Sequence, residues 1–202
     1  GQNQVMGLHG DLTEDAWYSA NWGYNTITRR NGTGTGAVWS RNIGTTAGGV
    51  AVDATSVYGF RNGSATIYVL NRSNGGVTKT FNLSPYYGSS LYGGVFVTDG
   101  KLWLNHPTDR IYYRYNVADG SYDGTSFSVA ASVYNGAWNG KEVCVSANSN
   151  QVYCYAPPAS NESYAPRIIG VDPKSHGGGF SLFHNEYWYP EWSGGNVHRY
   201  AL

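Results

Sequence analysis

A motif centred on glycine recurs along the chain at nearly constant intervals. It reads AGGVAVDATSVYGF from residue 47, YGGVFVTDGKLWL from residue 92 and HGGGFSLFHNEYWY from residue 176. The spacings between its successive glycines are 42, 45, 42 and 42 residues, counted between Gly7, Gly49, Gly94, Gly136 and Gly178. A repeat of this length indicates a propeller or a solenoid, in which each unit stacks against the next.

Each unit has room for four short strands. An apolar or aromatic run follows each glycine, and a second run follows after a short polar loop. Four units then add a further run: AVWSRNI, KTFNL, TSFSV and APRII. The composition agrees, because 28 Gly, 18 Tyr and 7 Trp with only 13% charged residues suit strands and turns better than helices. The sequence therefore predicts an all-β fold, a five-bladed β-propeller with about 42 residues per blade.

The repeat makes residues 1–202 a single domain. Its blades are expected at residues 7–47, 48–91, 92–133, 134–175 and 176–202. The fifth unit ends after its third strand, so residues 1–6 close the ring, or the fifth blade is three-stranded, or the natural chain is longer. Paired glycines suit inner strands that converge on a narrow axis, because glycine lets backbones approach closely. A two-sheet jelly roll is the rival fold, but it does not explain the period.

The two cysteines test the strand assignment. In VCVSANSNQVYCY the hairpin is centred near Ser149, which places Cys144 opposite Cys154 on adjacent antiparallel strands. A disulfide there closes a short loop and contributes roughly 2–3 kcal/mol by chain entropy. The alternative is a pair of reduced cysteines in the core.

Several features favour a secreted protein. Five N-x-[ST] glycosylation sequons occur, at Asn31, Asn62, Asn71, Asn82 and Asn161, and the cysteine count is even. With Gly at position 1 and no signal peptide, the sequence is typical of a mature or excised product. Thirteen basic and thirteen acidic residues leave no electrostatic footprint for nucleic acid. No apolar segment approaches the roughly 20 residues that span a bilayer, so no membrane insertion is expected.

Strand alternation places the loops between the second and third strands on one face, together with the loops that lead to the next unit. These loops combine aromatic residues with Asn, Asp, His and Arg, as in SANWGYN, NHPTDR and PEWSGGN. A sugar offers an apolar C–H face to aromatic rings and hydroxyls to amides and carboxylates. The candidate ligand-binding residues are therefore Trp22, Tyr86, Tyr87, His106, Asp109 and Trp192. The alternative for each is a structural role, as a wedge between blades or in a turn.

The pattern of Gly-Gly, aromatic hairpin and Ile-Tyr resembles five-bladed propeller lectins of the tachylectin-2 type. The resemblance covers the whole chain as blade architecture and implies about one sugar site per repeat. The longer repeat motifs of that family are absent, so no binding residue carries over. We expect a carbohydrate-binding protein with glycans or glycoproteins as partners. A self-assembling structural module of an extracellular matrix, filament or adhesive is the alternative.

A propeller glycosidase is the second alternative. Glycoside hydrolysis needs a pair of carboxylates about 5–10 Å apart. The acids near inner strands are Asp11, Asp53, Asp99, Glu142 and Glu186. Asp53 and Asp99 occupy turns and have a structural explanation, so no catalytic residue is assigned. No cofactor is expected, and no metal site, because the five histidines lack ligand spacing and DGSYDGT (119–125) is explained by two Asp-Gly turns.

Overall fold

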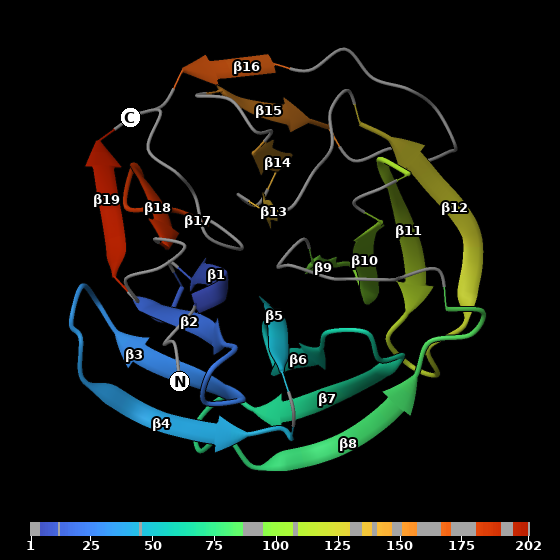
Figure 1. Cartoon of the computed structure of the whole chain (residues 1–202), viewed down its shortest axis with the longest axis horizontal. Helices are drawn as coiled ribbons and strands as arrows, with labels where there is room; N and C mark the ends of the chain where they lie inside the picture. Colours follow the sequence, from blue (N-terminus) through green and yellow to red (C-terminus); the bar gives the residue numbers. More distant parts are fainter. Residues whose placement is uncertain are drawn as a thin grey trace.

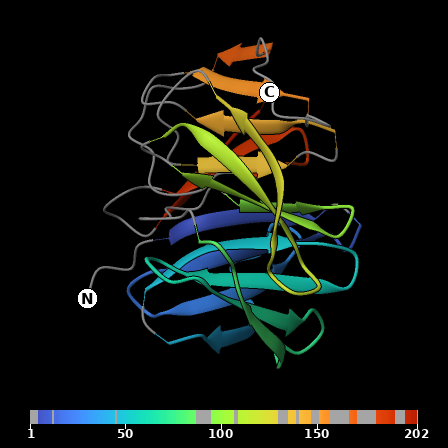
Figure 2. The ribbon, with the colours of Figure 1, turned by 90° about the vertical axis from the view of Figure 1, so that its right-hand side faces the viewer.

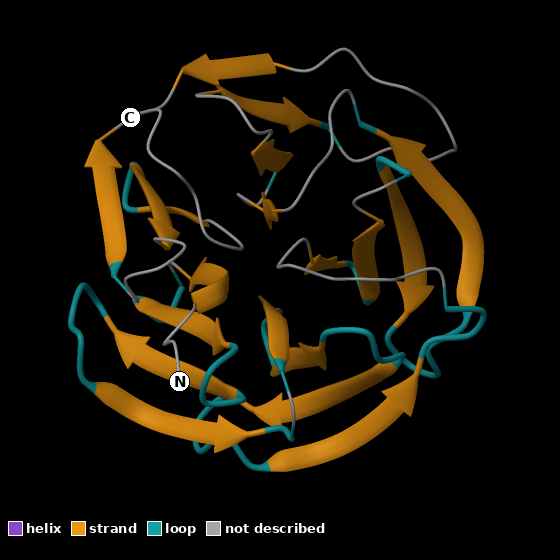
Figure 3. Cartoon of the chain, viewed as in Figure 1, coloured by secondary structure: helices purple, strands orange, loops and turns teal. Residues whose placement is uncertain are grey.

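The regular structure of the chain is entirely β-strand (Figure 3). The computed structural model describes residues 5–11, 13–44, 46–86, 95–106, 109–129, 135–138, 141–146, 151–156, 167–170, 181–190 and 196–201. In these ranges the strands pair antiparallel within five sheets, which surround a common axis (Figure 1). Among the described residues, no helix has the length and apolarity that crossing a membrane requires.

The strands of each sheet follow one another in the sequence. Sheet 1 consists of β1 (Val5–Asp11), β2 (Ala16–Asn21), β3 (Thr26–Asn31) and β4 (Ala37–Asn42). Sheet 2 consists of β5 (Ala47–Val52), β6 (Ser56–Arg61), β7 (Thr66–Asn71) and β8 (Val77–Asn82). Sheet 3 consists of β9 (Val95–Thr98), β10 (Lys101–His106), β11 (Ile111–Asn116) and β12 (Tyr122–Ser128). Sheet 4 consists of β13 (Asn135–Trp138), β14 (Val143–Ser146), β15 (Gln151–Tyr155) and β16 (Arg167–Gly170). Sheet 5 consists of β17 (Ser181–Phe183), β18 (Glu186–Pro190) and β19 (Val197–Ala201).

The first strand of each sheet lies nearest the axis, and the last strand lies at the periphery (Figure 1). Strand β1 contacts β5, β5 contacts β9, β9 contacts β13, β13 contacts β17, and β17 contacts β1. Viewed from the side, the strands run between two faces that carry the connecting loops (Figure 2). Val5 and Met6 belong to β1 and extend the inner strand of sheet 1, whereas residues 1–4 lie outside the described residues.

Close backbone approach explains the glycines of the first two sheets. A Cβ atom added to Gly7 would lie 2.8 Å from the Cα of Gly49, nearer than Cβ atoms come to other heavy atoms. The inner strands β1 and β5 therefore converge as the paired glycines predict. Gly94 and Gly178 lie outside the described residues.

Apolar side chains fill the seams between neighbouring sheets. One face of sheet 1 contributes Tyr18, Ile27 and Trp39 to the cluster shared with sheet 2. Similar clusters join sheets 2 and 3, sheets 3 and 4, and sheets 4 and 5. The cluster between sheets 5 and 1 contains Trp17 and Trp188. Alternation along each strand thus sends successive side chains into the two seams that flank a sheet.

The predicted disulfide is confirmed. Cys144 in β14 pairs in register with Cys154 in β15, their Cα atoms are 4.0 Å apart, and their sulfur atoms are bonded. Both residues are buried between sheets 4 and 5.

The double variant Cys144→Ala with Cys154→Ala is expected to unfold with a free energy lower by about 2–3 kcal/mol, because the open chain gains conformational entropy. Urea denaturation followed by tryptophan fluorescence measures the change. Wild-type protein under reducing conditions serves as the control, and it should shift in the same direction. Identical midpoints for the oxidised wild type and the double variant would contradict the expectation.

Candidate functional site

The loops between the second and third strands of a sheet lie on the same face of the molecule as the links to the next sheet. We call this face the loop face. The turn between β2 and β3 contacts the segment that follows β4. There the amide of Ile43 donates to the carbonyl of Asn25 at 3.0 Å, and the amide of Thr46 donates to the Asn25 side-chain oxygen at 2.6 Å. The loops within a sheet are therefore held against the link to the next sheet.

The structure brings together two of the six candidate ligand residues. The Nδ1 atom of His106, at the end of β10, accepts a hydrogen bond from the amide of Asp109 at 3.1 Å, and the Asp109 carboxylate lies 3.2 Å from the same nitrogen. Trp22 lies half-buried in the turn after β2, in a different sheet. Tyr86 packs against the cluster of sheets 2 and 3, and burial raises its pKa to about 12. Tyr87 and Trp192 lie outside the described residues.

Three of the sequon asparagines, Asn31, Asn71 and Asn82, are exposed. Asn62 is half-buried, and Asn161 lies outside the described residues. Glycosylation at these sites remains a prediction.

The acidic residues considered for a glycosidase make structural contacts. The carboxylate of Asp11 pairs with the buried guanidinium of Arg72. Asp53 accepts hydrogen bonds from the amides of Thr55 and Ser56 and from the hydroxyl of Tyr58. Burial alone would raise the pKa of Asp53, but these bonds hold it below its usual value. Asp53 therefore stays ionised.

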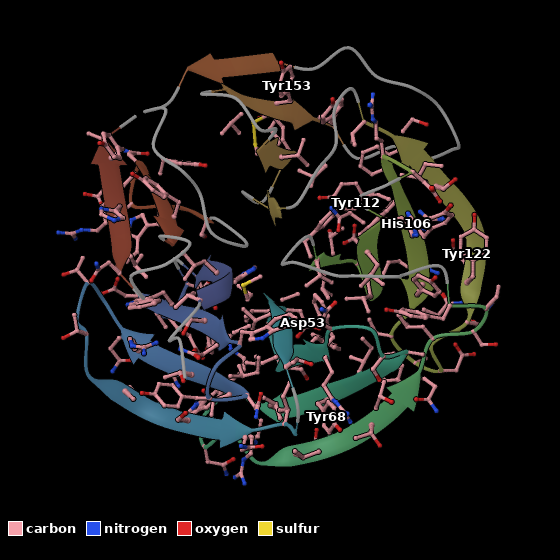
Figure 4. All side chains as sticks on the ribbon, in the orientation of Figure 1. Asp53, Tyr68, His106, Tyr112, Tyr122 and Tyr153 are labelled. Atoms are coloured by element: carbon pink, nitrogen blue, oxygen red, sulfur yellow. A yellow bond between two sulfur atoms is a disulfide. The ribbon has the colours of Figure 1, made fainter. Side chains whose placement is uncertain are left out.

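The other acids are similarly placed. Asp99 has a φ of +51° in the turn that Asp99-Gly100 predicts, and Glu186 accepts a hydrogen bond from the indole of Trp188 at 2.9 Å. Glu142 lies near both cysteine sulfurs, but the disulfide leaves neither sulfur available to a metal. Figure 4 shows Asp53 at the inner part of sheet 2 and His106 in sheet 3, so they do not form one site.

A groove of about 840 Å³ opens between sheets 1 and 5. Trp17 from β2 and Trp188 from β18 form its floor, with ring centroids 5.8 Å apart and exposed fractions of 7% and 3%. Arg30 lies over the ring of Trp17, and Arg199 lies over the ring of Trp188. The floor is therefore aromatic, and two guanidinium groups lie over it.

Polar side chains line the rest of the groove. Hydroxyls project from β2, β3 and β4, and the Thr28 and Ser40 hydroxyls are 3.0 Å apart. Amides from Asn21 and Asn196 lie toward the loop face. Tyr24 is 58% exposed at the rim. Of the described lining residues, none is Asp or Glu.

The groove exists because sheet 1 has different residues from the other sheets on the side that faces the preceding sheet. Tyr68, Tyr113 and Tyr153 take one position in the third strand of sheets 2, 3 and 4, and each packs into the seam toward the preceding sheet. The pairing register places Thr28 at the same position in β3. Figure 4 labels Tyr68 and Tyr153, which mark two of the filled seams. A threonine leaves the volume of a phenol ring empty.

Strand β3 also differs from the third strands of the other sheets at the next position on this side, which is Arg30. Arg30 stands where sheets 2, 3 and 4 have the buried residues Leu70, Tyr115 and Tyr155. Sheet 5 also has three described strands, so it offers no counterpart to β4. Sequence reasoning that looked for loops missed this site. The available signal was TITRR in the first unit against TIYVL, IYYRY and QVYCY in the next three.

Comparison with known proteins identifies the architecture. No family model and no curated protein matches the sequence. A glutaminyl cyclase from Myxococcus xanthus is similar in structure, with a TM-score of 0.74 and 12% identity over 100% of this chain and 92% of that chain. Nidogen from a nidogen–laminin complex follows with a TM-score of 0.62 and 13% identity, covering 100% of this chain and 77% of that chain.

The WD40 β-propeller domain of Doa1 has a TM-score of 0.60 and 16% identity, covering 96% of this chain and 62% of that chain. These similarities establish the propeller architecture that the repeat predicts, and they do not support the tachylectin-2 type in particular. At such identities they carry no information about activity. The chain is a β-propeller.

Proposed function

We propose that this protein is a secreted carbohydrate-binding protein whose sugar site is the groove between sheets 1 and 5. The observation that carries the proposal is the departure of sheet 1 from its own repeat. Where three other sheets fill the seam with tyrosine, Thr28 leaves an open space lined by hydroxyls and amides. A seam that served only to join two sheets would gain stability from a tyrosine there.

The lining suits a sugar. The exposed hydroxyl of Ser40 can both donate and accept hydrogen bonds, as sugar hydroxyls do. The hydroxyls of Thr28 and Ser19 are buried beneath the groove surface, where they contact Ser40 and Arg30. The exposed ring of Tyr24 can cover an apolar sugar face at the rim. A groove that is open to solvent gives weak binding at one site, because few contacts offset the loss of freedom on association. Several copies on one surface would bind through avidity.

The same lining supports binding without turnover. Hydrolysis by the usual route requires two carboxylates beside the scissile bond, and the described lining of the groove has no carboxylate. The proposal also takes the five sheets as the blades of a closed five-bladed propeller, since β17 contacts β1. The disulfide suits an oxidising compartment and supports secretion. Trp22, His106 and Asp109 remain candidates for a further sugar site on the loop face.

Filling the groove should weaken binding. The variant Thr28→Tyr inserts the residue that sheets 2, 3 and 4 use, so it is expected to weaken glycan binding at least about tenfold, or 1.4 kcal/mol, while the fold persists. A glycan array followed by titration of the strongest ligand measures the loss.

Thr80→Tyr is the matched control. Thr80 is exposed on β8 and pairs with Tyr68 as Ser40 pairs with Thr28, so the control adds the same ring outside the groove. Unchanged binding by Thr28→Tyr would contradict a sugar site in the groove. If wild-type protein binds no glycan on the array, the proposal is wrong and the structural-module alternative takes its place.

A further inference from the structure

Two arginines cover the floor of the groove. The guanidinium carbon of Arg30 lies 4.5 Å from the ring centroid of Trp17, and that of Arg199 lies 5.3 Å from the ring centroid of Trp188. Cations are attracted to the faces of indole rings, so each arginine has a defined position over its tryptophan. Both arginines line the groove, and the two indoles beneath them are neighbours.

The charge of Arg30 is not balanced by a described carboxylate. Its Nε donates to the carbonyl of Thr35 at 3.1 Å, and its Nη1 donates to the hydroxyl of Ser19 at 2.8 Å. Both acceptors are neutral, and within the described parts of the chain Nη2 makes no hydrogen bond. Arg30 is half-buried, and this burial lowers the pKa of its guanidinium. Among the described residues, Arg199 forms one ion pair, with the carboxylate of Glu186 at 3.9 Å.

An arginine is also an unfavourable choice for this seam on packing grounds. The corresponding positions of sheets 2, 3 and 4 hold Leu70, Tyr115 and Tyr155, which bury apolar surface. Partial burial of an unpaired charge lowers stability unless a counter-charge arrives. Arg30 is therefore a half-buried cation for which the described residues supply no carboxylate, and a bound anion would stabilise it.

We propose that the groove selects glycans that carry an acidic group, a carboxylate or a sulfate, and that Arg30 binds this group through Nη2. The inference rests on the proposed function and names the class of sugar. Guanidinium donors form charge-assisted hydrogen bonds with carboxylates and sulfates. The chain as a whole has no net charge, so a preference for acidic sugars has to come from the local arrangement of Arg30 and Arg199.

The experiment uses a panel of acidic oligosaccharides, each paired with a neutral counterpart that lacks only the acidic group. The pairs include an oligogalacturonate with its carboxyl-reduced form, a sialylated glycan with its desialylated form, and a sulfated oligosaccharide with its desulfated form. Polyglutamate is the polyanion without sugar. Binding is measured for wild type, for Arg30→Gln and for Arg41→Gln.

We expect wild type to bind the acidic member of at least one pair about tenfold or more tightly than its neutral partner. Arg30→Gln should remove that difference. Arg41→Gln should retain it, because Arg41 lies on the other side of sheet 1, where its Nε donates to the carbonyl of Gly75 in sheet 2. The acidic group of the best ligand, carboxylate or sulfate, identifies which chemistry the site prefers.

Three results would overturn parts of the account. Equal binding of acidic and neutral members, or a preference that survives in Arg30→Gln, overturns the acidic-glycan inference and leaves carbohydrate binding standing. Binding of polyglutamate as tight as that of the best acidic sugar overturns both, because the groove then recognises charge alone. An absence of binding to every member of the panel, acidic and neutral, also overturns both.

Discussion

Replacing Arg72 with methionine is expected to lower the free energy of unfolding by about 3–5 kcal/mol. The Arg72 side chain is 7% exposed in the seam between sheets 1 and 2. Its Nη2 pairs with the carboxylates of Asp11 and Glu14, and its Nη1 donates to the carbonyl of Asp53. Methionine fills much of the volume but leaves the Asp11 carboxylate, which is 11% exposed, without its cation.

The control for this variant is Arg110→Met, which removes an exposed arginine from the turn before β11 and is expected to change stability by less than about 0.5 kcal/mol. Adding Asp11→Asn to Arg72→Met should restore part of the lost stability, because the side chain at position 11 is then uncharged and no longer needs a cation. Urea denaturation of the variants measures these differences. A loss below about 1 kcal/mol for Arg72→Met would show that Arg72 does not hold the seam together.

The second large effect is expected at Gly120, where sheets 2 and 3 meet. Gly120 has a φ of +81°, and a Cβ atom there would lie 2.2 Å from the carbonyl oxygen of Asn82. The carbonyl of Gly120 also accepts a hydrogen bond from the amide of Ser84 at 2.9 Å, so the loop cannot move away without breaking this link. Gly120→Ala should therefore lower stability by about 3 kcal/mol, from backbone strain and overpacking together.

Gly124→Ala isolates the strain from the clash. Gly124 has a φ of +84°, but a Cβ atom there would meet nothing within 4 Å. The expected loss is about 1 kcal/mol, which is the penalty of a left-handed conformation alone. Thermal and urea denaturation of both variants give the comparison. Equal losses for the two variants would mean that the close approach to Asn82 relaxes at little cost.

The strand content of this fold could be predicted from sequence because every unit repeats the same local pattern. The Cys144–Cys154 register followed from the symmetry of one hairpin, and the approach of Gly7 to Gly49 followed from convergence at the axis. These inferences need only local geometry. The ion pair of Asp11 with Arg72 joins residues 61 positions apart on two sheets, and no local sequence pattern predicts it.

The groove was missed for a related reason. It joins Trp17 to Trp188, at opposite ends of the chain, and it arises from a ring that is missing at Thr28. A search for aromatic residues in loops identifies rings that are present, such as Trp22 and His106, and it does not identify a position where a ring is missing. Comparing the repeats position by position would have shown the departure, because Thr28 and Arg30 stand where other units have tyrosine or leucine.

A crystal structure of the protein with its strongest-binding oligosaccharide would show where the sugar binds. We expect sugar density in the groove between sheets 1 and 5, against the ring of Tyr24 and the hydroxyl of Ser40, with an acidic group beside Arg30. Density confined to the loop face around Trp22, His106 and Asp109, with the groove holding only solvent, would contradict this expectation.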